Sequence, residues 1–240
     1  MKKVLLLAGA MLALTSSLAL AQGNIDLAWN DCSIGWGGVG LSDQANNCNN
    51  TGALTLVASF SPPDTMKQFN GHAGVVDIQV AAASLDNWWH LETGGCRAGR
   101  MSGSFDFVAG PFSCFDVWAG GASGGINLGT IGANRIRART VCAIPGVTQV
   151  DPGVEYYVFK LTISKVQSTG VGSCAGCTDP ACIVFNQILV TQPAGVGDFT
   201  ITTGPQQYAT YKGGTGVTSG CPLATPTRKG TWGSVKALYR

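Results

Sequence analysis

The chain of 240 residues carries 15 Lys and Arg against 13 Asp and Glu, and its small formal net charge of +2 excludes the basic footprint of a nucleic-acid-binding protein. Only 12% of the residues are charged while 34 are glycine, which argues against a helical bundle. Because 45% of the residues are hydrophobic, the chain can fold around a core rather than remain disordered.

Residues 1–21 have the three parts of a secretory signal peptide. Lys2 and Lys3 form a basic start, a long apolar run follows, and a small-residue cleavage site ends at Ala21. We therefore predict export and a mature domain over residues 22–240, in which 13 basic residues balance 13 acidic ones. No later stretch is apolar enough to span a bilayer, so we expect a soluble protein, extracellular or periplasmic.

Alternation of apolar and polar residues predicts about nine strands in the mature chain. The clearest is 155–165, whereas 182–190 is apolar on both faces and is typical of a central strand. In chain order the predicted strands are 25–29, 54–60, 75–82, 88–92, 104–108, 135–143, 155–165, 182–190 and 198–202.

Turns rich in glycine and proline separate these strands, and no long helical pattern lies between them to form parallel crossovers. We therefore predict an all-β fold, a single antiparallel β-sandwich of jelly-roll type that disulfides stabilise. The glycine-rich stretches 120–132 and 213–220 are expected to be long loops. A short C-terminal helix is predicted, with Thr231 as its N-cap and with Val235 and Leu238 facing inward.

The predicted mature chain contains all nine cysteines, and an oxidising compartment favours disulfides between them. The sequence does not select a connectivity, although short separations make Cys32 with Cys48 and Cys96 with Cys114 the easiest loops to close. One thiol is left over, and we expect it to be free and buried rather than paired with a second chain. The nine are Cys32, Cys48, Cys96, Cys114, Cys142, Cys174, Cys177, Cys182 and Cys221.

Cys174, Cys177 and Cys182 form the densest cysteine cluster. Three thiolates at this spacing could supply most of a zinc site or a thiol redox pair. A structural zinc needs a fourth ligand and reduced thiols, and a redox pair normally opens a helix, which the Gly and Pro residues here do not predict. We therefore predict structural disulfides in this segment, no metal and no cofactor.

The sequence holds no complete catalytic set. Its two histidines, His72 and His90, are too few for a multi-histidine metal centre. Ser123 lies in a Gly-x-Ser-x-Gly pattern, but more glycine follows it in place of a helix, and both histidines precede it. Paired acids such as Glu92 and Asp106 would suit a small secreted carbohydrate-active hydrolase, which we keep as an alternative function.

Three tryptophans are candidate ligand contacts. In an extended strand the adjacent Trp88 and Trp89 would point to opposite faces, so one is expected at the surface. An exposed indole there, together with Trp118, could stack on a sugar ring. The competing interpretation is that all three pack in the core.

Arg135, Arg137 and Arg139 alternate with other residues and so place three guanidinium groups on one strand face. They could bind an anionic polymer such as an acidic glycan through forked hydrogen bonds, or pair with acids on a neighbouring strand. The mature chain has no overall positive field, so the second interpretation is favoured.

Three stretches resemble a group of secreted bacterial proteins that share a cysteine framework and a Trp-Gly-x-x-Lys-x-Leu-Tyr-Arg tail. They are Ile25-Asp-Leu-Ala-Trp-Asn-Asp-Cys32, the segment from Cys174-Ala-Gly-Cys177 to Cys182-Ile-Val-Phe-Asn186, and Thr231-Trp-Gly-Ser-Val-Lys-Ala-Leu-Tyr-Arg240. The resemblance implies export and a common disulfide framework, and it implies no particular activity.

Export, the strand patterns and the missing catalytic set together predict a secreted, non-catalytic module that acts at a surface, in a matrix or on carbohydrate. The expected partner is an extracellular glycan or cell-surface polymer, not nucleic acid. Exposure of Trp88, Trp89 and Trp118 would favour ligand binding, while burial of all three would favour a structural or assembly role. Self-association through an exposed strand edge or the odd cysteine is the third alternative.

Overall fold

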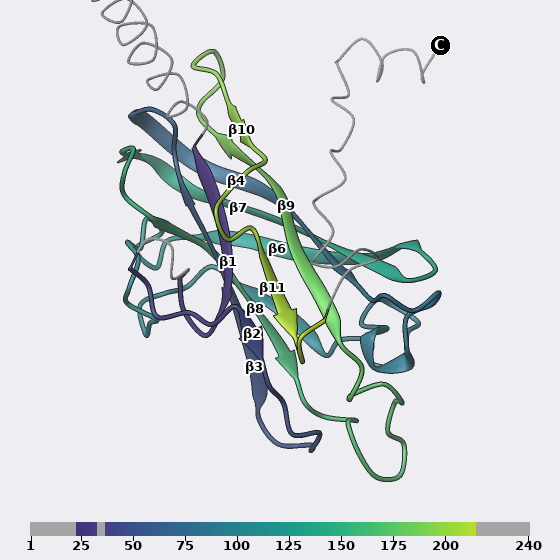
Figure 1. Ribbon diagram of the computed structural model, residues 1–240. Helices are drawn as coiled ribbons and strands as arrows, with labels where there is room; N and C mark the ends of the chain where they lie inside the picture. Colours follow the sequence, from purple (N-terminus) through teal and green to yellow (C-terminus); the bar gives the residue numbers. More distant parts are fainter. Residues whose placement is uncertain (1–22, 33–36, 215–240) are drawn as a thin grey trace, which may run out of the picture.

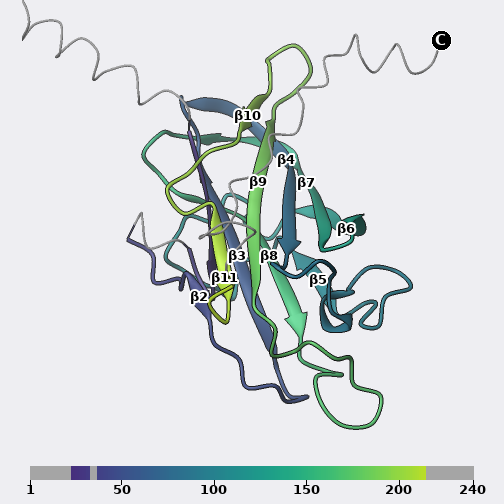
Figure 2. The same ribbon diagram turned by 45° about the vertical axis from the view of Figure 1, so that its right-hand side comes forward.

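The structure is a computed structural model that describes residues 23–32 and 37–214. Over these residues the chain forms two facing β-sheets, a β-sandwich, shown from two directions in Figure 1 and Figure 2. This all-β architecture confirms the predicted fold class. The predicted signal peptide, 1–21, and the predicted helix that begins at Thr231 lie outside the described residues.

The smaller sheet has the strand order β1-β3-β8-β5, and the larger has the order β2-β11-β9-β4-β7-β6 with β10 beside β9. Neighbouring strands are antiparallel except for the pair β2 and β11. The strands are β1 (Asn24–Trp29), β2 (Asp43–Gln44), β3 (Ala53–Ser61), β4 (Met66–Gln79), β5 (Met101–Ser104), β6 (Ser123–Gly132), β7 (Arg135–Val150), β8 (Tyr156–Ser164), β9 (Ala181–Thr191), β10 (Phe199–Ile201) and β11 (Tyr208–Tyr211).

The hydrophobic core lies between the two sheets and follows the predicted periods. On β8, the alternate residues Leu161 and Ile163 are buried, whereas Lys160 and Thr162 are half-buried. This alternation is expected for a strand with one face in the core. Residues 181–186 of β9 are buried on both faces, and the strand lies between β4 and β11 in the larger sheet. The interpretation of 182–190 as a central strand is therefore confirmed.

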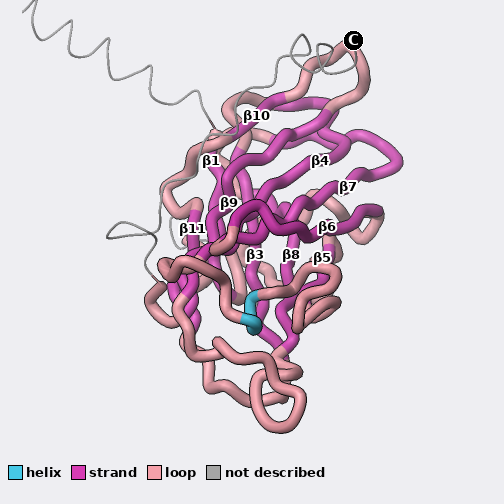
Figure 3. Tube along the Cα trace, turned by 90° about the vertical axis from the view of Figure 1, so that its right-hand side faces the viewer, coloured by secondary structure: helices cyan, strands magenta, loops and turns pink. Residues whose placement is uncertain are grey.

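Two predicted strands and one predicted loop are wrong. Residues 88–92 do not form a strand, since the chain makes a short 3-10 turn at Asn87–Trp89, the helical turn coloured in Figure 3. The stretch 104–108 lies after β5, which ends at Ser104. The glycine-rich stretch 120–132, predicted as a loop, contains β6. Glycine has a low β-propensity, but β7 supplies a pairing partner for almost the whole of β6.

Strand β4 begins at Met66, well before the predicted start at residue 75. The part before residue 75 contains Gly71 and Gly74, which interrupt the alternation of side chains from which strands are predicted. A Cβ added to Gly71 would collide with the main-chain oxygen of Cys142 on β7, and one added to Gly74 would lie 2.6 Å from Thr140 Oγ1. The glycines therefore allow the close approach of two long strands.

The disulfides join segments that are far apart in the sequence. The pairs are Cys32–Cys114, Cys48–Cys177 and Cys96–Cys174, so the expected pairs Cys32–Cys48 and Cys96–Cys114 are wrong. Sequence separation did not decide the connectivity, because the fold places cysteines from distant segments side by side. Cys182 is also disulfide-bonded, and its partner lies outside the described residues.

Among the described cysteines, Cys142 is free and buried, as expected for the odd thiol. Burial raises the pKa of the Cys142 thiol to about 12, so this side chain is an unreactive apolar group in the core.

Candidate functional site

The three tryptophans predicted as ligand contacts are buried. Trp88 and Trp89 have no exposed surface, and Trp118 is 2% exposed. The expectation that either Trp88 or Trp89 points outward is wrong, because both lie in the turn Asn87–Trp89 rather than in a strand. A buried indole cannot stack on a sugar ring, so these side chains do not form a carbohydrate platform.

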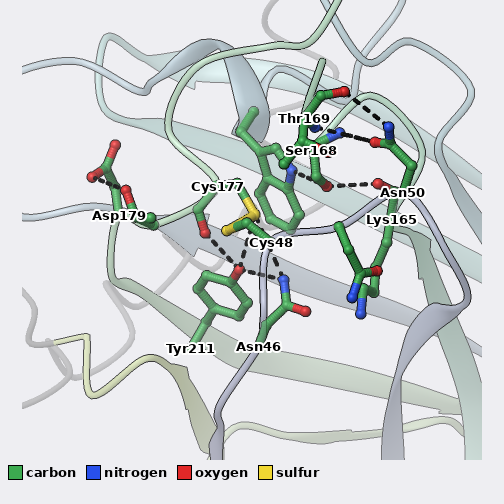
Figure 4. Close-up of a disulfide and its surroundings, with 12 residues drawn as sticks. Asn46, Cys48, Asn50, Lys165, Ser168, Thr169, Cys177, Asp179 and Tyr211 are labelled. Carbon is green, nitrogen blue, oxygen red and sulfur yellow. Dashed lines mark hydrogen bonds between the residues drawn. A yellow bond between two sulfur atoms is a disulfide. The ribbon is translucent and has the colours of Figure 1, made fainter.

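Trp88 belongs to an aromatic cluster beside the disulfide Cys48–Cys177. Its ring stacks on that of Tyr211 with the ring centres 5.4 Å apart, and its Nε1 donates to Ser168 Oγ at 2.9 Å. The Tyr211 hydroxyl donates to the main-chain oxygen of Cys177 at 2.7 Å (Figure 4). The disulfide and these hydrogen bonds hold the loop between β8 and β9 against the sandwich, so the cluster is structural.

Arg97 is a buried cation that the sequence analysis missed. It has no exposed surface and donates to the main-chain oxygens of Trp88 at 3.0 Å, of Val166 at 3.3 Å and of Ser164. The centre of its guanidinium group lies 3.9 Å from the centre of the Trp88 ring. Burial lowers the pKa of Arg97 to about 10. Main-chain oxygens and an aromatic face thus satisfy this cation, which organises the loops and faces no substrate.

His72 lies in the core and does not serve as a base. Its ring packs against the rings of Phe105, Trp118 and Phe159, and its Nε2 shares a hydrogen bond of 3.2 Å with Thr140 Oγ1. Burial lowers the pKa of His72 to about 3, because the apolar surroundings penalise the charged ring. The side chain is therefore neutral at physiological pH.

Of the other catalytic candidates, His90 and Glu92 are in contact. His90 Nδ1 lies 2.7 Å from Glu92 Oε1. Ser123 is the exposed first residue of β6, so it lies on a strand and not on a nucleophile elbow. Asp106 accepts a hydrogen bond from the main chain of its own loop at Val108, and neither Glu92 nor Asp106 lines the hollow described next.

Asp86 and Asp179 are two carboxyl groups that share a hydrogen bond at the rim of a hollow of about 350 Å³. Burial and this hydrogen bond raise the pKa of Asp86. Two carboxyl groups in contact cannot both ionise easily, so the pair holds one proton into a higher pH range than a single aspartate would. The residues that line the hollow are Val80, Ala81, Ala82, Asp86, Asp179, Pro180 and Gly213.

Glu155 is a buried carboxyl group beside β1. Ser59 Oγ donates to its Oε1 at 2.5 Å, while burial, Asp26 and Asp31 together raise the pKa of Glu155 to about 7. One of its carboxyl oxygens lies within 4.8 Å of the sulfurs of Cys32 and Cys114. Those sulfurs are joined in a disulfide and are not available as thiolate ligands, so this group does not make a metal site.

Two of the three arginines of the stripe on β7 contact one carboxylate on β4. Arg137 Nε lies 2.6 Å from Asp77 Oδ1 and its Nη2 lies 2.8 Å from Oδ2, a forked pair that raises the pKa of Arg137. Arg135 Nη1 lies 3.7 Å from the same carboxylate, and Arg139 is exposed. The favoured interpretation, pairing with an acid on a neighbouring strand, is confirmed for Arg137 and Arg135.

Strand β6 forms one edge of the larger sheet, and the sequence analysis did not find it. Its only neighbour in the sheet order is β7, and within the described residues its main chain hydrogen-bonds to no segment besides β7. The strand reads Ser-Gly-Gly-Ile-Asn-Leu-Gly-Thr-Ile-Gly, with no charge and no proline. A Cβ added to Gly125 or Gly129 would meet no atom within 4 Å, so the outer face of the sheet is open above these two positions.

The opposite edge of the sandwich is closed. Strand β1 pairs with β3 on one side, and on its other side Ile25 N donates to Thr203 O at 3.0 Å and Leu27 N donates to Gln206 O at 2.8 Å. Trp29 and Leu41 exchange two main-chain hydrogen bonds of 2.9 Å. The main-chain groups along β1 are therefore satisfied on both sides.

The loop between β5 and β6 carries three exposed apolar side chains. Val108 and Phe115 are each 66% exposed, and Phe112 is 78% exposed. The disulfide Cys32–Cys114 ties this loop to the chain after β1.

No protein-family model matches the sequence, and no curated protein matches it. The resemblance to secreted bacterial proteins therefore stays a prediction. Among solved structures, the chain is similar to a cohesin module from a family 33 glycoside hydrolase of Clostridium perfringens ATCC13124, with 9% identity and a TM-score of 0.38. The match covers 79% of this chain and 93% of that one. At this score the likeness says nothing about function.

No helix in the described part of the chain is both long and apolar enough to cross a membrane.

Proposed function

We propose that the protein is an exported, non-catalytic β-sandwich module that joins a cell-surface or matrix assembly by pairing β6 with another polypeptide strand. The observation that carries the proposal is the open, uncharged edge of β6. A sheet edge presents a row of unpaired N–H and C=O groups whose spacing matches a further strand. Burial of the three candidate tryptophans supports an assembly role over sugar stacking.

The residue composition of β6 supports a role for this edge in binding another strand. Soluble proteins usually protect edge strands with lysines, prolines, bulges or a covering segment. The ten residues of β6 include no charge and no proline, and their register with β7 shifts only near the end of the strand, between Thr130 and Gly132. Segments around Thr203 and Leu41 cover β1. The chain therefore covers the edge at β1 and leaves the edge at β6 able to pair.

The compartment supports the same proposal. Three disulfides within the described residues need an oxidising environment, which fits export by the predicted signal peptide. An exported protein with many disulfides and no net charge in its mature chain suits a surface or matrix location.

Retention at the cell surface tests the proposal. The full chain would be produced in its native host as wild type, as the edge variant Gly125→Lys/Gly129→Lys, and as the control Gly146→Lys. Gly146 lies on β7, is exposed, and like the two edge positions has room for a Cβ. We expect wild type and control to stay with the surface fraction and the edge variant to appear in the medium. Equal retention of all three would contradict the proposal.

A hydrolase is the second candidate function, and the hydrogen-bonded pair Asp86 and Asp179 favours it. A carboxyl group that keeps its proton beside an ionised one can act as a general acid while its neighbour acts as a base. The pair replaces Glu92 and Asp106, which do not line the hollow. Hydrolysis of a cell-wall or secreted polysaccharide by wild type and not by Asp179→Asn would support this function, and equal product from both proteins would reject it.

A further inference from the structure

We infer that the strand that pairs with β6 is β6 of a second copy, so that two sandwiches share one continuous sheet across a two-fold axis. The inference rests on the proposed function and names its partner. It follows from the side-chain pattern of β6 and from two exposed apolar residues beside it.

The geometry of antiparallel strands limits how two copies of β6 can pair. Alternate residues of a strand direct their main-chain groups to opposite neighbours, so half of those on β6 face away from β7. Two identical edges can satisfy these groups only when a residue pairs with itself at the two-fold axis. Leu128 lies near the middle of β6, and with Leu128 at the axis the five residues 126–130 of each strand pair before the register shift between Thr130 and Gly132.

The register with Leu128 at the axis also places apolar side chains of the two copies next to each other. On the face toward the core, Ile126 and Leu128 are half-buried in the single copy. In the pair, Leu128 meets its counterpart and Ile126 meets Thr130 of the other copy, which extends the apolar face of the sandwich. Cross-strand pairs of this kind stabilise a sheet.

On the outer face, the same register places a side chain of the second copy over Gly125, where the single copy has none. Gly125 lies opposite Val141 of β7, which is 55% exposed, and a Cβ on Gly125 would meet nothing within 4 Å. Ile131, near the end of β6, is 38% exposed. With Leu128 at the axis, Ile131 of one copy, which lies at the register shift of β6, comes next to Gly125 and Val141 of the other copy. Pairing therefore covers two exposed apolar side chains from each copy.

Charge does not oppose the pairing. Strand β6 carries none, and the predicted mature chain has 13 basic and 13 acidic residues. Arg137, on the strand next to β6, is paired with Asp77, and the exposed Arg139 lies opposite the uncharged Asn127 of β6.

Sedimentation of the purified mature protein tests the inference. We expect wild type and Gly146→Lys to double in mass as protein concentration rises. The edge variant Gly125→Lys/Gly129→Lys places lysines diagonally opposite lysines of the second copy, and we expect it to weaken association by roughly tenfold or more. Thermal unfolding of the variant at low concentration confirms that the single sandwich still folds.

A charge-swapped partner makes the test specific for self-pairing. Gly125→Glu/Gly129→Glu alone should also stay monomeric, and mixing it with the lysine variant should restore a dimer of the two. A wild-type protein that remains monomeric at all concentrations would overturn the inference, as would a dimer that both edge variants leave unchanged. The proposed function is judged separately by surface retention, which a monomer that binds a different strand would still show.

Discussion

The two sides of the sandwich handle their edge strands in opposite ways. Along β1, main-chain groups bond to the segment 203–206 and to Leu41, and Asp26 Oδ1 accepts a hydrogen bond from Gln206 N at 2.9 Å. Along β6, the main chain bonds only to β7 among the described segments. One chain thus contains both a covered and an uncovered edge. The unpaired main chain at β6 is therefore a local property of that strand, since the same fold pairs the main chain of β1 on both sides.

The closed side also carries a disulfide whose loss should have a large effect. Cys32–Cys114 spans 82 residues, and loop-closure entropy assigns a bridge of this span about 4 kcal/mol of stability. We expect Cys32→Ser/Cys114→Ser to lower the free energy of unfolding by about 2–4 kcal/mol in urea titrations. The control Cys142→Ala, at the free buried thiol, should cost about 1 kcal/mol. Equal losses for the two would show that the bridge does not stabilise the closed side.

Two buried titratable groups should give the protein a flat stability profile in mild acid. The pKa of Glu155 rises on folding to about 7, so its contribution is full at low pH and is lost as pH rises from about 4.5 to 7. The pKa of His72 falls on folding to about 3, so its contribution is full above about 6.5 and is lost as pH falls toward 3. Between about pH 4.5 and 6.5 the two slopes oppose each other.

Removing either group should expose the slope of the other. We expect Glu155→Gln to become more stable as pH rises through that window, and His72→Gln to become less stable, each by about 1.4 kcal/mol per pH unit. Chemical unfolding at several pH values measures both. If neither variant changes the slope, Glu155 and His72 do not titrate as their burial implies.

The arginine stripe should divide into a paired and an unpaired part. Asp77 is almost fully buried and accepts a forked pair from Arg137, so Asp77→Asn should cost about 1–2 kcal/mol of unfolding free energy. Arg139→Gln removes an exposed cation and should change stability by less than about 0.5 kcal/mol. Thermal unfolding of both variants measures these losses. A larger loss of stability for Arg139→Gln than for Asp77→Asn would contradict the assignment of Arg137 as the paired arginine and Arg139 as the unpaired one.

The sequence predicted well those elements whose side chains alternate or run apolar. The strand at 155–165 and the central strand at 182–190 were found because burial on one or both faces leaves a direct pattern. Strand β6 and the part of β4 before residue 75 were missed because glycines replace the alternating side chains, and only the partner strand β7 makes them strands. The disulfide pairs were missed for a related reason, since the fold and not chain separation brings the cysteines together.

The candidate site was harder to predict than the fold. The tryptophan prediction depended on an extended backbone at Trp88, and the 3-10 turn removed that condition. The sequence feature that corresponds to the open edge is the uncharged run Gly-Ile-Asn-Leu-Gly in β6. It could not be distinguished from a loop without knowledge of which strand lies at the end of the sheet.

Amide hydrogen exchange of the purified protein tests the central claim most directly, because it reads both edges in one sample. We predict that amides of β1 are protected at every protein concentration, while alternate amides of β6 exchange fast in dilute protein and slow as concentration rises. Protection of those β6 amides that is already complete in the dilute monomer, or absent at all concentrations, would contradict the account of β6 as an open edge that pairs with a second copy.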